Sequence, residues 1–445
     1  MTDETDTTHT VPDSAPRESH DHLRPEFVRN VLDLVESGEI EAARAKVEPL
    51  HPADIADLVE LTPAEQRQSL AAAIAGLIDG DVLAEMNDWV RDELIDALDP
   101  HEVADIAAEL DTDDAVAIIE DMEEEDQRAV LRALDPDDRA AIEEALSYPE
   151  ESAGRLMQRE LIAVPEHWSV GDVLDYLRGE EELATDFWEI FVVDPGHKPV
   201  GTCALSWILR TPRAVAMGDV MKREQTLIPV GMDQEEVALI FQKYALISAA
   251  VVDDSGRLVG MVTVDDIVHI ISEEAGEDAL LLSGAGEGDI NEPIVDTYKA
   301  RVRWLIANLG TAMVAATIIG LFEGTIAKMV TLAALMPIVA GVGGNAGTQT
   351  MAVTVRALAT NQLTQSNTWR AIRREIQVAL LNGMTIAAVL GIGVGLVFQN
   401  ALLGGVIATA MLANIVFPGC PGAFGPLALA RLPADPAAAP SGVVT

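Results

Sequence analysis

A cluster of glycines and side-chain amides lies inside a long uncharged segment of this sequence, residues 329–355. The cluster contains Gly341, Gly344, Asn345 and Gln349, and its two amides are four residues apart, on one face of a helix. Glycine weakens helices and amides are costly in hydrocarbon, so such residues usually face other helices or a water-filled path. The pattern therefore predicts a path for a polar solute across a membrane.

Oxygen atoms are the ligands that this segment offers. Side-chain amides and bare carbonyls beside glycines suit a hard cation such as Mg²⁺, which prefers oxygen ligands and keeps several of its waters. A softer metal would favour His or Cys in the apolar spans, where only Cys420 occurs. The alternative is a glycine-based seam between packed helices, with Asn345 as a bridge between them. The residues alone leave both interpretations open.

The sequence offers no catalytic constellation. No Ser-His-Asp or Cys-His arrangement has supporting context, and no glycine-rich phosphate loop follows a strand. The eight histidines are scattered, and Cys203 and Cys420 are the only cysteines, so neither a disulfide framework nor a thiolate metal site is indicated. We therefore expect no catalytic residues and no enzyme.

Charge divides the chain into two contrasting parts. Residues 1–300 hold 70 acidic and 21 basic residues, a net of −49, whereas residues 301–445 hold 3 acidic and 8 basic residues, a net of +5. Like charges destabilise a compact state by self-repulsion. Either the acidic part is a solvated surface, as in a salt-adapted protein, or cations offset its charge at specific sites. So acidic a chain also argues against a nucleic-acid partner.

The acidic part begins with a tail and a helical region. Residues 1–24 are polar, lack the features of a signal peptide, and are expected to be a disordered tail. Residues 25–150 indicate short helices in a solenoid-like stack, in which Thr62, Asp99 and Asp135 fit N-cap positions. We expect this region to be an acidic, all-α superhelical N domain.

Residues 151–272 contain two similar stretches about 60 residues apart, each with a short strand, a helix, two β-branched strands and a closing helix. Both contain Val-Val-Asp, at 192–194 and 251–253. These features resemble a tandem pair of α/β CBS domains, which are ligand-sensing modules, and the resemblance makes ATP a candidate ligand. The nucleotide-type Thr/Ser-x-x-Asp signature is present at residues 263–266, whereas the first repeat has Ser206-Trp-Ile-Leu209 in its place.

A connecting helix, residues 273–300, is expected to lead into an α-helical transmembrane domain, residues 301–445. The apolar runs of that domain are residues 302–322, 329–355, 376–398 and 401–429. Basic residues gather on one side of these spans: Arg301, Arg303, Arg356, Arg370, Arg373, Arg374 and Arg431. That side is expected to be cytosolic. We therefore predict a multi-pass protein of the cell (inner) membrane, in contact with lipid, with cytosolic N-terminal domains.

Two motifs resemble the MgtE family of Mg²⁺ channels and transporters. They are Pro337-x3-Gly341-x-Gly343-Gly344-Asn345-x-Gly347-x-Gln349, followed by Val355-Arg-Ala-Leu-Ala-Thr360, and Arg301-Val-Arg-Trp304. The order of the domains is similar as well. The resemblance implies a homodimer with a central pore and no coupled hydrolysis. It also implies that Mg²⁺ bound between acidic cytosolic domains holds the pore shut.

The same resemblance assigns Mg²⁺-sensing roles to carboxylates in three regions. These are Asp81 and Asp113 in the N domain, Asp233, Glu235 and Asp266 in the CBS pair, and Glu274, Glu277 and Asp278 in the connecting helix. Ala245 and His269 stand where related sequences can carry Asp, which weakens the sites linked to the CBS pair. For any one of these carboxylates, a solvated helix face is the alternative.

The C-terminal end departs from the family pattern. The family has five membrane helices, and its fifth helix carries an Asp that anchors Mg²⁺ in the pore. Asp435 resembles the loop before that helix, and the chain ends at Thr445. We expect residues 417–426 to form a poor helix because they contain three prolines. The interpretation favoured is a truncated or frame-damaged chain with four spans. A transporter of another divalent cation such as Co²⁺, or a non-conducting membrane-anchored Mg²⁺ sensor, remains as an alternative.

Overall fold

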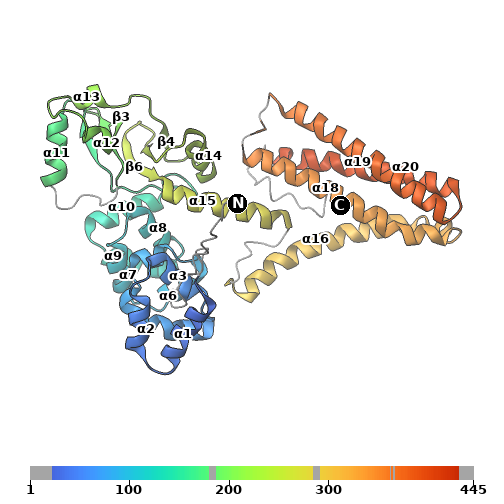
Figure 1. Cartoon of the computed structure of the whole chain (residues 1–445), viewed down its shortest axis with the longest axis horizontal. Helices are drawn as coiled ribbons and strands as arrows, with labels where there is room; N and C mark the ends of the chain where they lie inside the picture. Colours follow the sequence, from blue (N-terminus) through green and yellow to red (C-terminus); the bar gives the residue numbers. More distant parts are fainter. Residues whose placement is uncertain (1–22, 180–186, 284–290, 361, 364–365, 430–445) are drawn as a thin grey trace, which may run out of the picture. The chain divides into compact units, whose positions relative to one another are not determined.

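The computed structural model describes residues 23–179, 187–283, 291–360, 362–363 and 366–429. The chain forms two compact units, Met1–Ile267 and Val268–Thr445 (Figure 1). The first unit contains a helical domain and two small sheets, and the second contains long apolar helices. The expected fold class is confirmed: an all-α superhelical N domain, α/β tandem CBS domains and an α-helical domain with four apolar helices.

Short helices build the N domain. They are α1 (Pro25–Glu36), α2 (Ile40–Val47), α3 (Pro52–Glu60), α4 (Ala64–Ile74), η1 (Ala75–Leu77), α5 (Gly80–Ala84), α6 (Asp88–Ile95), α7 (Pro100–Ala107), α8 (Thr112–Glu120), α9 (Glu124–Ala133) and α10 (Pro136–Leu146). Their apolar faces form one continuous core that runs along the whole stack.

Two of the three helix N-caps expected from the sequence are confirmed, and one is wrong. Asp99 caps α7, and Glu102 returns to accept from the Asp99 backbone N–H at 2.9 Å, which completes a capping box. Asp135 lies at the N-cap of α10, as expected. The expectation for Thr62 is wrong, because α4 begins after Pro63 and the buried Thr62 hydroxyl donates to the Leu58 carbonyl, 2.7 Å away in α3.

Two sheets of identical topology form the CBS pair. The first contains β1 (Ala163–Pro165), β2 (Glu189–Val193) and β3 (Pro199–Ala204), and the second contains β4 (Leu227–Pro229), β5 (Ser248–Val252) and β6 (Leu258–Thr263). In each sheet the first strand pairs parallel to the second, and the second pairs antiparallel to the third. The helices of this region are α11 (Val170–Gly179), α12 (Leu205–Ile208), α13 (Met217–Val220), α14 (Gln234–Tyr244) and α15 (Val264–Ser283).

The registers of the two sheets correct the alignment of the repeats. Ala204 pairs with Glu189 in the first sheet, as Thr263 pairs with Ser248 in the second. The counterparts of the Thr263–Asp266 signature are therefore Ala204 and Trp207, and not Ser206 and Leu209. The expected position in the first repeat is therefore two residues too far along the chain. The first repeat still lacks an Asp at this position.

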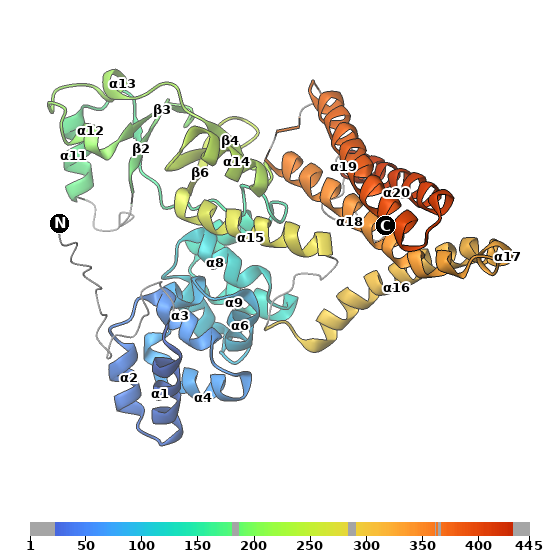
Figure 2. The same cartoon turned by 45° about the vertical axis from the view of Figure 1, so that its right-hand side comes forward.

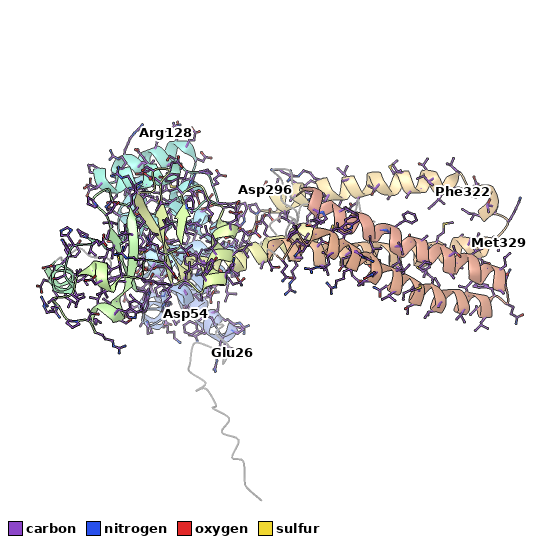
Figure 3. The ribbon with its side chains drawn as sticks, turned by 90° about the horizontal axis from the view of Figure 1, so that it is seen from above. Glu26, Asp54, Arg128, Asp296, Phe322 and Met329 are labelled. Carbon is purple, nitrogen blue, oxygen red and sulfur yellow. The ribbon has the colours of Figure 1, made fainter. Side chains whose placement is uncertain are left out.

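After the end of α15, the described residues of the second unit form α16 (Ile294–Gly320), α17 (Glu323–Ile326), α18 (Val330–Ala359), α19 (Thr368–Val397) and α20 (Ala401–Leu429). Four of them, all but α17, are long and apolar enough to cross a membrane. Figure 2 shows α18, α19 and α20 side by side, and α20 contacts both of the others. In Figure 3, Asp296 lies at the start of α16, while Phe322 and Met329 lie together at its other end.

The expectation of a poor helix at residues 417–426 is wrong. The helix α20 continues from Ala401 to Leu429 through its prolines. A Cβ at Gly422 would lie 2.8 Å from the Gly347 carbonyl oxygen, so close packing against α18 supports this part of the helix. Tertiary contacts here override the local preference of proline.

Candidate functional site

The α18 helix carries two distinct faces, both made of small and polar residues. Gly343, Gly347, Thr350 and Thr354 are buried along one face. That face packs against α20, where the positions of Gly343 and Gly422 leave no room for a Cβ. The glycine-based seam therefore exists, and it includes Gly343 and Gly347 but not Gly341.

The seam is closed by an asparagine that sequence reasoning missed. The Nδ2 of Asn414 in α20 donates to the Val339 carbonyl at 2.6 Å. A Cβ at residue 343 would overlap the Asn414 side chain, so Gly343 is needed for this contact. The bridge between the helices is thus made by Asn414 and not by Asn345. Its only signal in the sequence was one amide in an otherwise apolar span.

The other face of α18 contains the predicted pore residues. Gly341, Asn345 and Gln349 are exposed, and Gly344 is half-buried. A Cβ at Gly341 would meet nothing within 4 Å. Neither amide side chain makes a hydrogen bond to any residue that the structure describes. The four residues therefore form one face, on which the two amide side chains have no hydrogen-bond partner in the described part of this chain, and their role in a pore stays a prediction.

A second site of interest is a carboxylate cluster in the first unit. Asp111, Asp113 and Asp114 lie at the start of α8, and Asp265 and Asp266 lie in the first turn of α15. Asp266 raises the pKa of all three α8 carboxyls by repulsion. The positive ends of the two helix dipoles offset part of this repulsion. The structure thus brings the predicted sensor residues Asp113 and Asp266 into one electrostatic cluster.

Burial makes the repulsion within the cluster stronger. Burial, followed by repulsion from neighbouring carboxylates, raises the pKa of Asp111 and of Asp114 to about 6. The same causes raise the pKa of Asp113 well above its ordinary value. The Asp113 Oδ1 is sealed from solvent and has no hydrogen-bond partner among the described residues. Such an oxygen is suited to a proton or a cation.

Glu160 is a further member of the cluster, and sequence reasoning missed it. Its carboxylate accepts hydrogen bonds from the Thr112 backbone N–H at 3.2 Å and from the Thr112 hydroxyl at 2.8 Å. It also raises the pKa of Asp111 by repulsion. Glu160 therefore ties the start of α8 to the segment that precedes β1.

The remaining predicted sensor residues lie in other places. Asp81 is in the first turn of α5 and adds to the pKa shifts of Asp111 and Asp114. Asp233 caps α14 by accepting from the Glu235 backbone N–H at 3.0 Å, which is a structural role for its carboxylate. Glu274 lies further along α15.

The last group of predicted residues includes two that the structure does not place. Glu277 lies in α15 and is exposed. The side chain of Asp278 and the whole of Asp435 lie outside the described residues. Ala245, at the end of α14, has a left-handed backbone with φ of 50°, a conformation that Asp and Asn adopt more readily than Ala. His269 is exposed on α15.

No group of three or more His, Cys, Asp or Glu side chains is already arranged to hold a metal ion within the part of the chain that the structure describes. The carboxylates around α8 and α15 are gathered closely enough to repel one another, but they do not form a closed coordination shell. A bound cation would therefore have to draw them together or keep water in its own shell.

Three family models match separate parts of the chain. The MgtE intracellular N domain matches residues 50–151, the CBS domain matches residues 217–273, and the divalent cation transporter domain, MgtE, matches residues 336–445. Together they follow the order of the three structural regions. The second CBS repeat, which carries the Thr263–Asp266 signature, is the one matched.

Relatives of known name align over much of the chain. The magnesium transporter MgtE of Bacillus subtilis is 28% identical over 424 residues, which cover 94% of this chain and 93% of that protein. The magnesium transporter MgtE of Thermus thermophilus is 34% identical over 295 residues, 65% of each chain. A crystal structure of the cytosolic domain of the Mg²⁺ channel MgtE in complex with ATP is 28% identical, with a TM-score of 0.50, and the match covers 55% of this chain and 99% of that chain.

The seam between α18 and α20 predicts opposite results for two alanine substitutions. Gly343→Ala should lower the thermal midpoint of the full chain in detergent, because its Cβ displaces Asn414, and overpacking costs about 1–3 kcal/mol. Gly341→Ala is the matched control, since its Cβ enters open space. Equal midpoints for the two variants would contradict the packing described.

The raised pKa values predict how stability depends on pH. The Asp111 and Asp114 carboxyls have a pKa of about 6 in the folded chain against 3.8 for the ordinary group, so the folded state binds more protons between these values. The free energy of unfolding should therefore fall as pH rises from about 4 to about 6. Denaturant unfolding of the full chain without divalent ions measures this slope. Combining Asp111→Asn with Asp114→Asn should flatten this slope. Glu65→Gln, which changes an exposed carboxylate of α4, is the control and should leave the slope unchanged.

Proposed function

The chain belongs to the MgtE family, and we propose on that premise that it moves Mg²⁺ across a membrane along α18. The observation that carries the proposal is the exposed face of Gly341, Asn345 and Gln349 on a helix long enough to span the bilayer. Amide and carbonyl oxygens on this face would contact a hydrated cation. The relatives named magnesium transporter support Mg²⁺ over other divalent ions.

The open amide face also supports assembly as a homodimer. Amides exposed to hydrocarbon are costly, so the Asn345 and Gln349 face needs a polar or water-filled neighbour. A second copy related by two-fold symmetry would place the same face opposite itself and enclose a central path. The α16 helix, which has no buried residue within one copy, would gain packing in such a dimer.

We further propose that Mg²⁺ regulates its own passage through the carboxylate cluster. The ion would relieve the repulsion between Asp113 on α8 and Asp266 on α15, and so stabilise the arrangement in which the two helices meet. Asp81, Asp233, Glu235, Glu274, Glu277 and Asp278 are the further sensor carboxylates of this proposal. The α15 helix runs without a break from Val264 to Ser283, so a change at Asp266 acts on the helix that leads toward the membrane domain.

ATP is a proposed second ligand of the cytosolic unit. A related cytosolic domain was crystallised with ATP. In this chain the Thr263 hydroxyl donates to Asp266 Oδ2 at 2.6 Å, so the signature in the second repeat is formed. The first repeat has Trp207 at the equivalent position, which supports one nucleotide site rather than two.

The proposed location is the cell membrane, with the acidic unit in the cytosol. Arginines lie at the start of α16, at the end of α18 and at the start of α19, which are the ends expected on the cytosolic side. The connection between Phe322 and Met329, at the other end of α16 in Figure 3, carries one acid and one base.

Ion flux into liposomes tests conduction. The full chain should admit Mg²⁺ faster than Co²⁺, and Asn345→Leu should reduce the Mg²⁺ flux at least tenfold by removing an oxygen ligand from the path. Thr317→Val is the matched control, because Thr317 lies on α16 and its hydroxyl already donates to the Met313 carbonyl. An absence of Mg²⁺ flux would favour the non-conducting sensor, and a preference for Co²⁺ would favour the other divalent transporter.

Neutralising the carboxylate cluster tests regulation. Asp113→Asn combined with Asp266→Asn should stabilise the ion-free chain, because it removes buried repulsion, and should weaken the rise of the thermal midpoint on adding millimolar Mg²⁺. A ΔΔG of about 1 kcal/mol corresponds to roughly 2–4 °C in a unit of this size. Glu109→Gln, on an exposed position after α7, is the control. An unchanged Mg²⁺ response of the double variant would refute this role for the cluster.

A further inference from the structure

The first turns of α19 carry three arginines, two of which have no counter-charge among the described residues. Arg370 and Arg373 are exposed and make no hydrogen bond or ion pair with any described residue. The side chain of Arg374 is 76% exposed and forms a long ion pair with the Glu375 carboxylate, 3.9 Å away. Trp369 is 72% exposed beside them. In a chain with a net charge of −44, this is an unusual local excess of positive charge.

Helical spacing places the three arginines on one face, directed away from the bundle. Positions i, i+3 and i+4 are neighbours on a helix surface, and Arg370, Arg373 and Arg374 have that spacing. The buried face of α19 contains Ile372 and Gly383, and Gly383 packs against Leu412 of α20. The arginines therefore lie on the side of α19 that no other described helix covers.

An apolar face continues directly below the arginines. Leu380, Leu381 and Met384 follow on the same side of α19, and they are 44%, 60% and 46% exposed. The uncharged part of the helix, residues 376–397, is about 33 Å long at 1.5 Å per residue, which matches ~30 Å of hydrocarbon. Arg373 and Arg374 thus lie one turn or less outside the hydrocarbon, at the level of the headgroups, where Trp is also favoured.

Cationic side chains followed by an apolar face match the headgroup and the acyl chain of a phospholipid. We propose that the start of α19 binds the phosphate of an anionic phospholipid, whose acyl chain lies along Leu380, Leu381 and Met384. The forked guanidinium groups suit phosphate oxygens, and their charge favours a lipid with net negative charge over a zwitterionic one. A free phosphate would use the arginines but leave the apolar face and Trp369 without a partner. The inference needs α19 to lie in a membrane, and it is independent of Mg²⁺ conduction.

Lipid binding to the purified full chain tests the proposal. The chain in mild detergent is titrated with phosphatidylglycerol or phosphatidylcholine, and bound lipid is counted by native mass spectrometry. We expect phosphatidylglycerol to bind at least tenfold more tightly. An exposed cation near an anionic lipid is worth about 1 kcal/mol, so each of Arg370→Gln, Arg373→Gln and Arg374→Gln should weaken its binding roughly fivefold. Replacing all three arginines by Lys should retain part of the preference for phosphatidylglycerol. Lysine keeps the positive charge but lacks the forked guanidinium group that can donate two hydrogen bonds to one phosphate.

A matched control removes the same charge elsewhere. Arg29→Gln, Arg128→Gln and Arg210→Gln together neutralise three exposed arginines of the first unit and should leave the lipid preference unchanged. The variant that it matches combines Arg370→Gln, Arg373→Gln and Arg374→Gln. If this triple variant unfolds in detergent, the single Gln variants and the corresponding Lys variants test the proposal instead. Inorganic phosphate forms a separate titration and should raise the thermal midpoint far less than phosphatidylglycerol does.

Three results would overturn the proposal. Equal affinity for the two lipids would show that the arginines do not select charge, as expected if a second copy of the chain covers them. An unchanged preference in the α19 Gln variants would place the lipid elsewhere. Stabilisation by inorganic phosphate as large as that by phosphatidylglycerol would make this an anion site without a lipid. All three results are measured by lipid or phosphate binding, so they can be obtained even if the chain shows no Mg²⁺ flux.

Discussion

The contact between Asn414 and the Val339 carbonyl is the interaction on which the candidate ion path depends. Hydrocarbon offers no hydrogen-bond partners, so an amide on α20 has to find one inside the bundle. It finds the carbonyl at 2.6 Å because Gly343 leaves room for its side chain. This contact fixes the rotation of α18 about its own axis. Once that rotation is set, Asn345 and Gln349 necessarily lie on the side that α20 does not cover.

In the membrane unit a buried polar group finds a partner, whereas in the acidic unit carboxylates lie close to one another and repel. The α8 and α15 helices bring their acidic first turns into one region, and burial together with the resulting repulsion raises the pKa of Asp113 and its neighbours. Folding does not remove this cost, which persists in the ion-free state. Under the regulation proposed above, a divalent cation bound there would relieve this repulsion, and the stability of the unit would then rise with the ion concentration. Unrelieved repulsion between carboxylates would make the stability of this surface depend on bound cations. A surface whose carboxylates were all paired with arginine or lysine would not have that dependence.

Features set by neighbouring residues were predictable from the sequence, and features set by distant ones were not. The spans, the repeated strands and the caps at Asp99 and Asp135 depend on local periodicity and turn chemistry. The expectation for Thr62 failed because its hydroxyl bonds back to α3, and the one for residues 417–426 failed because α18 supports the prolines of α20. Glu160 and Asn414 were missed because their partners, Thr112 and Val339, are 48 and 75 residues away. No short motif signals a contact at that range.

The two CBS repeats have the same strand topology but differ in the polar residues at the start of their closing helices. Met157 packs where a Cβ at Gly260 would lie, as Met221 does at Gly201, so each repeat supports the other in the same way. Only the second repeat has a hydrogen-bonded Thr and Asp at the start of its closing helix, since Trp207 takes the equivalent place in the first. That closing helix is α15, which continues to Ser283, whereas α12 ends after one turn at Ile208. The charged residue Asp266 therefore belongs to the repeat with the long closing helix. A shift of α15 caused at Asp266 would extend to residues beyond the CBS domain itself.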